Sequence, residues 1–388
     1  MKYSLGLILV LLNINTIYGQ KINVKREFKF AEEQVNYMLS EIERADVKPG
    51  QVSPRTFENG KLKLVVSKDW TSGFFPGVLW YLYEYTGDAK WLTQAKKFTA
   101  KLEKEQFNKG THDLGFMIYC SYGNGFRLTK DENYKEVIIQ AAKSLSTRFS
   151  PQTGVIRSWD HHKDVWQFPV IIDNMMNLEL LFEATKLTGD SSFYKIAVTH
   201  ANNTIKNHFR SDNSSYHVVD YNPENGSVNK KMTHQGYADE SAWARGQAWA
   251  LYGFTLCFRE TGNRAYLNQA NKIASFILNH PNLPKDLVPY WDFNAPGIPA
   301  EPRDASAAAI IASALYELAG YSNSDMYKKK AGTILRSLSK GYHSPAKKNG
   351  GFILIHSTGH KPAKSEIDVP LAYADYYYLE ALLRSNRK

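Results

Sequence analysis

The sequence predicts an all-α protein folded as an (α/α)6 barrel, in which six inner helices are surrounded by six outer helices. Two observations indicate this fold. A helix–turn–helix pattern recurs along the chain, and nearly all-apolar helices alternate with amphipathic ones through these turns. We expect a single domain over residues 20–388, following a signal peptide at residues 1–19.

The recurring unit is a helix end, a short polar turn and a new helix start. Five such units begin at Glu84, Arg127, Lys186, Arg259 and Leu318. In four of them a glycine follows the expected helix end and predicts a left-handed C-cap; Asp or Asn then predicts the N-cap of the next helix. Each unit is therefore expected to form a helical hairpin.

The helices on the two sides of these turns differ in pattern. Those after a turn carry apolar residues on one side only, for example Trp91, Ala95, Phe98 and Leu102. Those before a turn, such as "ASAAAIIASALYEL", are apolar or small nearly all round, which predicts burial on both sides. The inner helices are expected to start near residues 74, 115, 173, 241, 304 and 369, and the outer helices near 26, 88, 131, 190, 263 and 325.

The first residues predict export. Lys2, an apolar run over residues 5–12 and Gly19 before Gln20 form the layout of a secretory signal, and the run is too short to span a bilayer. We expect an exported protein, periplasmic or secreted, with no membrane anchor.

Cysteine usage and charge narrow the classes of partner. Cys120 and Cys257 both stand in apolar, aromatic surroundings, which favours packed thiols over a disulfide framework. The net charge of +10 is spread along the chain without a nucleic-acid module, so it favours a small or polymeric anion over nucleic acid. Aromatic residues make up 13% of the chain and suit stacking on sugars, although core packing accounts for most of them.

Long connections rich in Trp, His, Asp, Gly and Pro lead into the inner helices, whereas the other turns are short. Function tends to lie in such loops, and six converging helix N-termini favour an anionic ligand. An aspartate stands at or just before each inner helix: Asp69, Asp113, Asp173, Asp239, Asp304 and Asp368. N-capping alone explains an aspartate at such a position, so position does not select a catalyst.

Two of these aspartates have contrasting surroundings. Asp173 lies in "PVIIDNMM", where burial disfavours the carboxylate and raises its pKa above the reference of about 3.9. Asp113 lies in the polar "THDLGF" and is its natural ionised partner. One protonated and one ionised carboxyl form the usual division of labour at a sugar-cleaving site. Asp113 and Asp173 are therefore the candidate catalytic pair.

Other residues of these connections suit a carbohydrate. The aromatic candidates for stacking are Trp70, Trp243 and Trp249, and the polar candidates are His217, Thr233, His234 and Gln235. Trp249 is equally well explained as a core residue. Arg245 either clamps a substrate carboxylate or pairs with Asp239 or Glu240. The histidines show no metal-ligand spacing such as HxxxH or HExxH, so we expect no metal and no cofactor.

Five segments, in this order, carry a family resemblance: "THDLGFM", "DNMMNLELL", "DESAWARGQAWALYGF", "PRDASAAAIIASALYEL" and "SEIDVPLAYADYYYLEAL". Together they closely resemble the unsaturated glucuronyl hydrolases, glycoside hydrolase family 88. The resemblance runs over nearly the whole mature chain. It implies an (α/α)6 barrel, which agrees with the helix count.

The resemblance also implies an unusual hydrolysis. Members of this family act on oligosaccharides left by polysaccharide lyases and hydrate the C4=C5 vinyl ether of the unsaturated uronic acid at the non-reducing end. The acid protonates C4, water adds at C5, and the hemiketal opens and releases the neighbouring sugar. The rule that relates carboxylate separation to retention or inversion therefore does not apply.

By motif, Asp173 resembles the family's general acid and base. Asp113 resembles the second catalytic aspartate, which positions the substrate and keeps the pKa of the first one high. Arg245 and Trp249 resemble uronate-site residues. Less securely matched, by position more than by sequence, are Trp70, His217, Thr233 and Gln235. The loop at 356–366 resembles the part that meets the second sugar but matches no sulfate-binding pattern, which leaves chondroitin, hyaluronan, heparin-type chains and ulvan open.

Three alternatives remain beside this reading. The related unsaturated rhamnogalacturonyl hydrolases share the barrel and the chemistry, but "DNMMN" with "ARGQAW" favours the glucuronyl family. On fold alone, a sugar epimerase or a glycan-binding protein also fits. An epimerase is expected to use His pairs as proton carriers, and a binding protein would not need a matched aspartate pair. The sequence predicts no particular oligomeric state.

Overall fold

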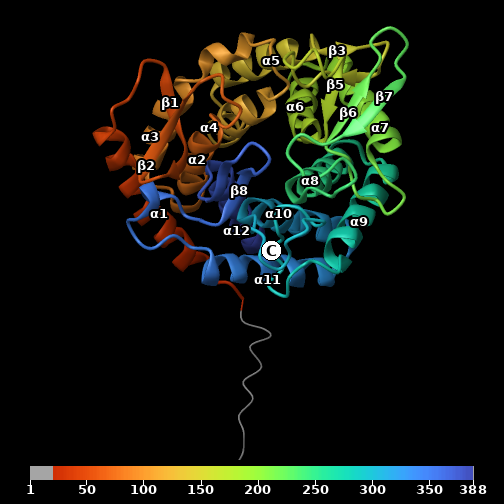
Figure 1. The fold of residues 1–388 in the computed structure, drawn as a ribbon. Coiled ribbons are helices and arrows are strands. Elements are labelled where there is room, and N and C mark those ends of the chain that lie inside the picture. Colours follow the sequence, from red (N-terminus) through yellow and green to blue (C-terminus); the bar gives the residue numbers. More distant parts are fainter. Residues whose placement is uncertain (1–20, 388) are drawn as a thin grey trace, which may run out of the picture.

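The computed structural model describes residues 21–387 and confirms the (α/α)6 barrel (Figure 1). Two of its inner helices begin with a turn of different winding. The inner ring consists of α2 (Phe74–Thr86), η2 (Gly115–Gly123) continued by α4 (Asn124–Thr129), η3 (Ile172–Asn177) continued by α6 (Leu178–Thr188), α8 (Ala244–Thr261), α10 (Ala305–Ser322) and α12 (Ala372–Asn386). Because α12 packs against both α10 and α2, the last inner helix closes the ring onto the first.

The outer ring alternates with the inner one along the chain. It consists of α1 (Val24–Arg44), α3 (Ala89–Ala100), α5 (Glu132–Ser146), α7 (Ser191–His208), α9 (Arg264–Asn279) and α11 (Asp325–Gly341). Short 3-10 turns lie at η1 (Glu103–Phe107) and η4 (Asn349–Gly351). The expected signal peptide falls outside the described residues.

The polar turns between the rings end one helix and start the next, as predicted. The side chains that cap the new helices are Asp88, Asp131, Asp190, Asn263 and Ser324. Gly87, Gly189 and Gly262 end the preceding helices in the left-handed conformation. The fourth expected glycine cap, Gly320, is wrong, because α10 runs on past it and ends at Asn323 (φ 48°).

The core lies between the two rings and along the barrel axis. The predicted inner face of α3 is buried, including Trp91 and Phe98, and α10 is buried continuously over residues 305–315. Cys120 and Cys257 are free, buried thiols, which confirms the prediction. Between residues 21 and 387, no helix is long and apolar enough to cross a membrane.

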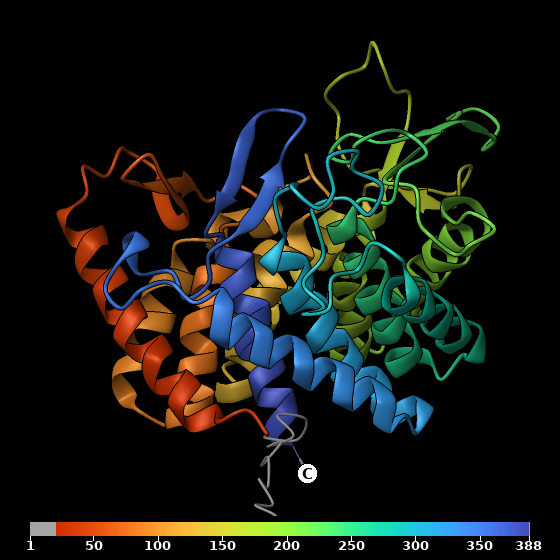
Figure 2. The same ribbon diagram turned by 60° about the horizontal axis from the view of Figure 1, so that its bottom comes forward.

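Short strands, which the sequence analysis did not predict, build up the long connections. They are β1 (Gln51–Glu58) with β2 (Lys61–Val66), β3 (Phe149–Ser150) with β4 (Val155–Ile156), β5 (Pro169–Ile171) with β6 (Val218–Tyr221) and β7 (Val228–Met232), and β8 (Ser357–His360) with β9 (Ser365–Val369), all antiparallel. The β8–β9 hairpin rises at one end of the barrel, and the C-terminus leaves at the other (Figure 2). We call the first end the rim and the second the base.

Candidate active site

Only one of the six rim aspartates caps its inner helix. Asp304 accepts hydrogen bonds from the backbone N–H groups of Ser306 and Ala307 at the start of α10. The other five inner helices begin after Gly73, Leu114, Ile171, Trp243 and Leu371, without a side-chain cap. N-capping is therefore wrong as a general explanation, and five aspartates need another one.

Three of these five aspartates support the loops around them. Asp69 pairs with Arg55 at 2.9 Å, and Asp368 with His356 at 2.6 Å. Asp239 Oδ1 accepts a hydrogen bond from the backbone N–H of Thr233 at 2.8 Å. The two that remain are Asp113 and Asp173.

Asp113 is held in the ionised form. Thr111 Oγ1 donates a hydrogen bond to its Oδ2 at 2.6 Å, and His112 Nε2 lies 3.1 Å from its Oδ1. Burial works to raise the pKa of Asp113, but His112, Thr111 and Arg148 outweigh it and leave the pKa below its usual value. The direction of this pKa shift agrees with the predicted ionised form of Asp113, whose catalytic role stays a prediction.

Asp173 has the opposite environment. It is 7% exposed, and its Oδ2 is a buried oxygen without a hydrogen-bond partner. Burial raises its pKa to about 7; His112 and Arg245 work against the shift, and Asp113 adds to it. The predicted rise is confirmed, with burial as its main cause and the second aspartate as a smaller one.

His217 faces the unpartnered oxygen of Asp173. Its Nδ1 accepts the backbone N–H groups of His234 and Gln235, both at 3.1 Å. Burial lowers the pKa of His217 well below its usual value, so the ring is neutral. The single proton then belongs on Nε2, which lies 3.7 Å from Asp173 Oδ2.

Asn177 connects the two segments that carry the aspartates. Its Oδ1 accepts the backbone N–H of Phe116 at 3.0 Å, which joins η3 to the first turn of η2. The η2 segment is a π-helix. This winding is rare in proteins, and where it occurs it often lies at a functional site. The two segments also approach closely, since a Cβ at residue 115 would lie 2.6 Å from Asn177 Cα. The sequence analysis missed Asn177, although it stands in the "DNMMN" motif.

Arg245 is buried and supports the β8–β9 hairpin. It pairs with Asp304 at 3.1 Å and donates to the carbonyl oxygens of Thr358 and Gly359 at 2.5 and 2.7 Å. The expected alternative of pairing with Asp239 or Glu240 is therefore wrong. Its Nε is a buried donor without a partner.

The predicted aromatic residues line the same rim. Trp249 is fully buried, yet its indole Nε1 has no hydrogen-bond partner. Trp70 packs 5.0 Å from Tyr373, whose buried hydroxyl is also unpartnered. Trp243 is 2% exposed and lies between His217, 4.5 Å away, and Arg245. Trp243 therefore acts as a wall of the site, and Trp249 combines core packing with a free donor.

Gln235 and Thr233 lie in the connection before α8. Gln235 Nε2 donates to the carbonyl oxygen of Gly359 at 3.1 Å, so it reaches the β8–β9 hairpin. Thr233 Oγ1 accepts the backbone N–H of Gly236 at 2.8 Å. Neither residue touches Asp113 or Asp173, and their binding roles stay predictions.

Of a second aromatic group at the rim, only His234 was among the predicted site residues. Trp159 lies 5.2 Å from Trp166 and 5.6 Å from His234, and His234 lies 4.8 Å from His360 on the β8–β9 hairpin. In the part of the chain that the structure describes, no group of three or more His, Cys, Asp or Glu side chains is arranged to hold a metal ion.

Unpartnered buried polar atoms thus gather where the six connections converge. They belong to Asp173, His217, Arg245, Trp249 and Tyr373. Buried polar groups without partners are costly in a folded protein, so their concentration here favours this place as the site of a polar ligand. A separate cavity lies at the base, but this chemistry is at the rim.

An (α/α)6 barrel whose rim holds one carboxyl with a raised pKa and one with a lowered pKa fits a glycoside hydrolase. Residues 50–386 match the model of Glycosyl Hydrolase Family 88, and the chain belongs to that family.

Individual relatives agree with this family. The chain is 54% identical over 322 residues to an unsaturated glucuronyl hydrolase of Formosa agariphila, over 82% of this chain and 80% of that protein. It superposes on the crystal structure of an unsaturated glucuronyl hydrolase specific for heparin with a TM-score of 0.88 at 47% identity, over 93% of this chain and 96% of that chain. A mutant of the Streptococcus agalactiae enzyme, complexed with dGlcA-GalNAc6S, gives a TM-score of 0.78 at 28% identity, over 98% and 97%.

Proposed function

We propose that the enzyme removes a 4,5-unsaturated uronic acid from the non-reducing end of oligosaccharides that lyases generate from glycosaminoglycans or ulvan. The relatives named unsaturated glucuronyl hydrolases support this substrate class. The observation that carries the proposal is the Asp173 carboxyl, which combines a pKa of about 7 with an unpartnered Oδ2 near an ionised Asp113.

Asp173 acts as the acid in the first step. With a pKa of about 7, half of it is protonated at neutral pH, whereas an unshifted carboxyl is protonated about one part in a thousand. The proton passes from Asp173 to C4 of the uronate ring, and the π electrons of the C4=C5 bond form the new C4–H bond. Positive charge then develops on C5 and the ring oxygen.

Water completes the reaction in the second step. A water oxygen bonds to C5 while the Asp173 carboxylate takes a proton from that water molecule. This regenerates the Asp173 acid and leaves a hemiketal at C5. The bond between C5 and the ring oxygen then breaks, C5 becomes a ketone, and the hydroxyl proton moves to the released oxygen. C1 is now a hemiacetal carbon: its bond to the glycosidic oxygen breaks, its hydroxyl proton passes to that oxygen, C1 becomes an aldehyde and the neighbouring sugar leaves as an alcohol.

The surrounding groups favour these charge changes. The ionised Asp113 stabilises the positive charge at C5 and keeps the pKa of Asp173 high. The neutral His217 donates through Nε2 toward the carboxylate that forms on Asp173. The free donors on Trp249 and Arg245 suit the uronate carboxylate. We assign Trp70, Thr233 and Gln235 to binding of the sugar rings.

The assay follows the ultraviolet absorbance of the conjugated C4=C5 bond in lyase-made disaccharides. Hydration removes this band. A panel of chondroitin, hyaluronan, heparin and ulvan products ranks the parent polymers by kcat/KM. If a folded protein leaves the band of all four products intact, the proposal is wrong.

We also propose that the protein is exported to the periplasm or the medium, on the pattern of residues 1–19. Expression of the full chain in a bacterial host tests this. An N-terminus that begins near Gln20 in the exported fraction supports it, and an uncleaved chain in the cytoplasm contradicts it.

A further inference from the structure

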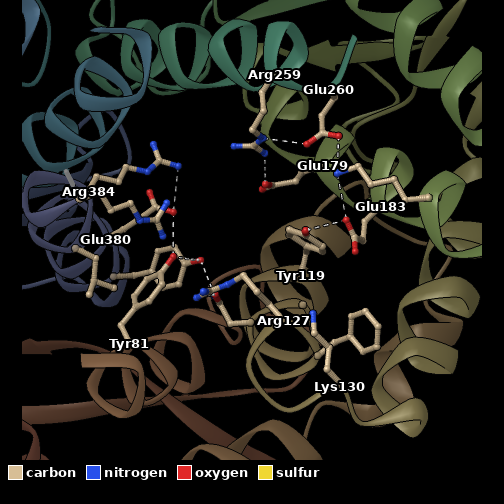
Figure 3. A pocket seen from close by; sticks show the side chains of 17 residues that line it. Tyr81, Tyr119, Arg127, Lys130, Glu179, Glu183, Arg259, Glu260, Glu380 and Arg384 are labelled. Atoms are coloured by element: carbon tan, nitrogen blue, oxygen red, sulfur yellow. Dashed lines mark hydrogen bonds and ion pairs between the residues drawn. The ribbon is translucent and has the colours of Figure 1, made fainter. Parts of the chain in front are cut away.

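The base of the barrel contains a cavity of about 530 Å³ that the proposed reaction does not use. This volume is within the usual range of small-molecule sites, about 300–1,000 Å³. Its walls come from inner helices on several sides of the ring, including α4, α6, α8 and α12, and Figure 3 shows the side chains that line it. Two of its lining residues, Arg127 and Lys186, have 42% and 55% of their side chains exposed, so the cavity opens to solvent.

Oppositely charged side chains alternate around the wall, and the arginines are already paired. Arg259 pairs with Glu179, Glu260 and Glu317. Arg384 pairs with Glu317 at 2.9 Å, and Arg127 binds Glu84 through two nitrogens. A polyanion would have to displace these carboxylates. The arginines of the base cavity are therefore less available to an anion than the unpartnered donors of the rim.

One carboxylate of the cavity wall, that of Glu183, has unused positions for accepting hydrogen bonds. Glu183 receives only long contacts, 3.5 Å from the Tyr119 hydroxyl and 3.4 Å from Lys186. A carboxylate has about four lone-pair positions, so Glu183 has room for further donors. Tyr119 stands beside it and turns its ring and hydroxyl toward the cavity (Figure 3).

We propose that the base cavity is a second binding site, for an uncharged polyhydroxylated ligand, a mono- or disaccharide. A hydroxyl group donates and accepts at once, so a sugar can bridge a guanidinium and a carboxylate without breaking the ion pair. The ring of Tyr119, which is partly exposed, provides apolar surface for the C–H face of a sugar. This site goes beyond the proposed reaction, because its walls contain neither Asp113 nor Asp173.

Cellobiose is the probe that tests this site. Saturation-transfer NMR with the whole protein is expected to detect binding at about 20 mM probe, since solvent-exposed polar sites bind in the millimolar range. Glu183→Ala removes a charged acceptor and is expected to weaken binding about tenfold. Tyr119→Phe keeps the ring and removes the hydroxyl, and about threefold weaker binding is expected.

Glu136→Ala is the matched control, because Glu136 is an exposed glutamate on the outer helix α5. It is expected to bind cellobiose like the unaltered protein. Melting temperatures and turnover of lyase products confirm that the cavity variants are folded and keep an intact rim. The proposal is overturned if no binding is seen at this concentration. It is also overturned if Asp173→Asn abolishes binding while Glu183→Ala and Tyr119→Phe leave it unchanged, since the probe would then sit at the rim.

Discussion

The rim and the base of the barrel each hold a carboxylic acid on the same inner segment, and the two acids differ in exposure and in their partners. Asp173 at the rim and Glu179 at the base both have a pKa raised to about 7, in each case mainly by burial. Glu179 pairs with Arg259, whereas Asp173 Oδ2 has no partner. A raised pKa therefore does not by itself mark a catalytic acid; the unused hydrogen-bonding position does.

The same contrast holds for the other polar groups at the two ends. The rim collects buried donors without partners, such as Trp249 Nε1 and Arg245 Nε. No such atom belongs to a described residue of the base cavity. A site with unsatisfied groups gains most from a ligand that satisfies them, which suits specific substrate binding and chemistry. A site whose groups are already paired suits weak, reversible binding.

Replacing each of the two acids in a separate variant tests this contrast most strongly. Asp173→Asn removes the proton donor, and kcat on a lyase-made disaccharide is expected to fall about 10³-fold or more. Glu179→Gln removes an acid of similar pKa that touches no reacting atom, and kcat is expected to change less than about twofold. Loss of the ultraviolet band gives both rates. If kcat falls equally in the two variants, the loss of turnover does not depend on whether the replaced acid lies at the rim or at the base.

The second prediction concerns the charge of Asp113. Asp113→Asn removes a stabilising negative charge and is expected to lower kcat about 100-fold. It also removes one cause of the raised pKa of Asp173, so the alkaline limb of the pH–rate profile is expected to move to lower pH.

Asp368→Asn is the matched control for this pH profile. Asp368 is another rim aspartate, 57% exposed and paired with His356. Its replacement is expected to leave both kcat and the alkaline limb in place. If the alkaline limb of the pH–rate profile does not move in Asp113→Asn, Asp113 does not influence the pKa of Asp173.

The barrel was predictable from the sequence because its signals are local. A turn such as the one around Gly87 and Asp88 ends one helix and starts another within a few residues, and the pattern recurs through the chain. The exception at Gly320 follows from the same physics. Asparagine also adopts the left-handed conformation, so α10 continues to Ser322 and Asn323 is its C-cap.

The site was predictable only in part, because its key contacts join distant segments. The apolar neighbours of Asp173 predicted its raised pKa, and the polar neighbours of Asp113 predicted its ionised form, with which its lowered pKa agrees. The partner of Arg245 was not predictable, since Asp304 is 59 residues away and two acidic residues stand closer in sequence. The tautomer of His217 likewise depends on backbone groups brought in by folding.

A third prediction uses stability in place of turnover. Because the pKa of Asp173 is higher in the folded protein than in the unfolded chain, ionisation of Asp173 destabilises the fold as pH rises from about 4 to about 7. Asp173→Asn is therefore expected to raise the free energy of unfolding at pH 8, by about 2 to 4 kcal/mol, and to have no such effect near pH 4. Urea unfolding at the two pH values measures this. A gain that is the same at both would contradict the raised pKa.

The smallest expected effect concerns the close approach that places the two aspartates. Gly115→Ala puts a Cβ 2.6 Å from Asn177 Cα, so η2 and η3 must move apart at a cost of about 1–3 kcal/mol. Gly320→Ala is the matched control, since that glycine lies inside α10 with nothing within 4 Å of the new Cβ, and it is expected to stabilise the fold by about 0.5–1 kcal/mol. If the close packing of η2 against η3 determines the distance between Asp113 and Asp173, Gly115→Ala also shifts the alkaline limb of the pH–rate profile. Lost stability with an unshifted limb would make Gly115 a packing residue only.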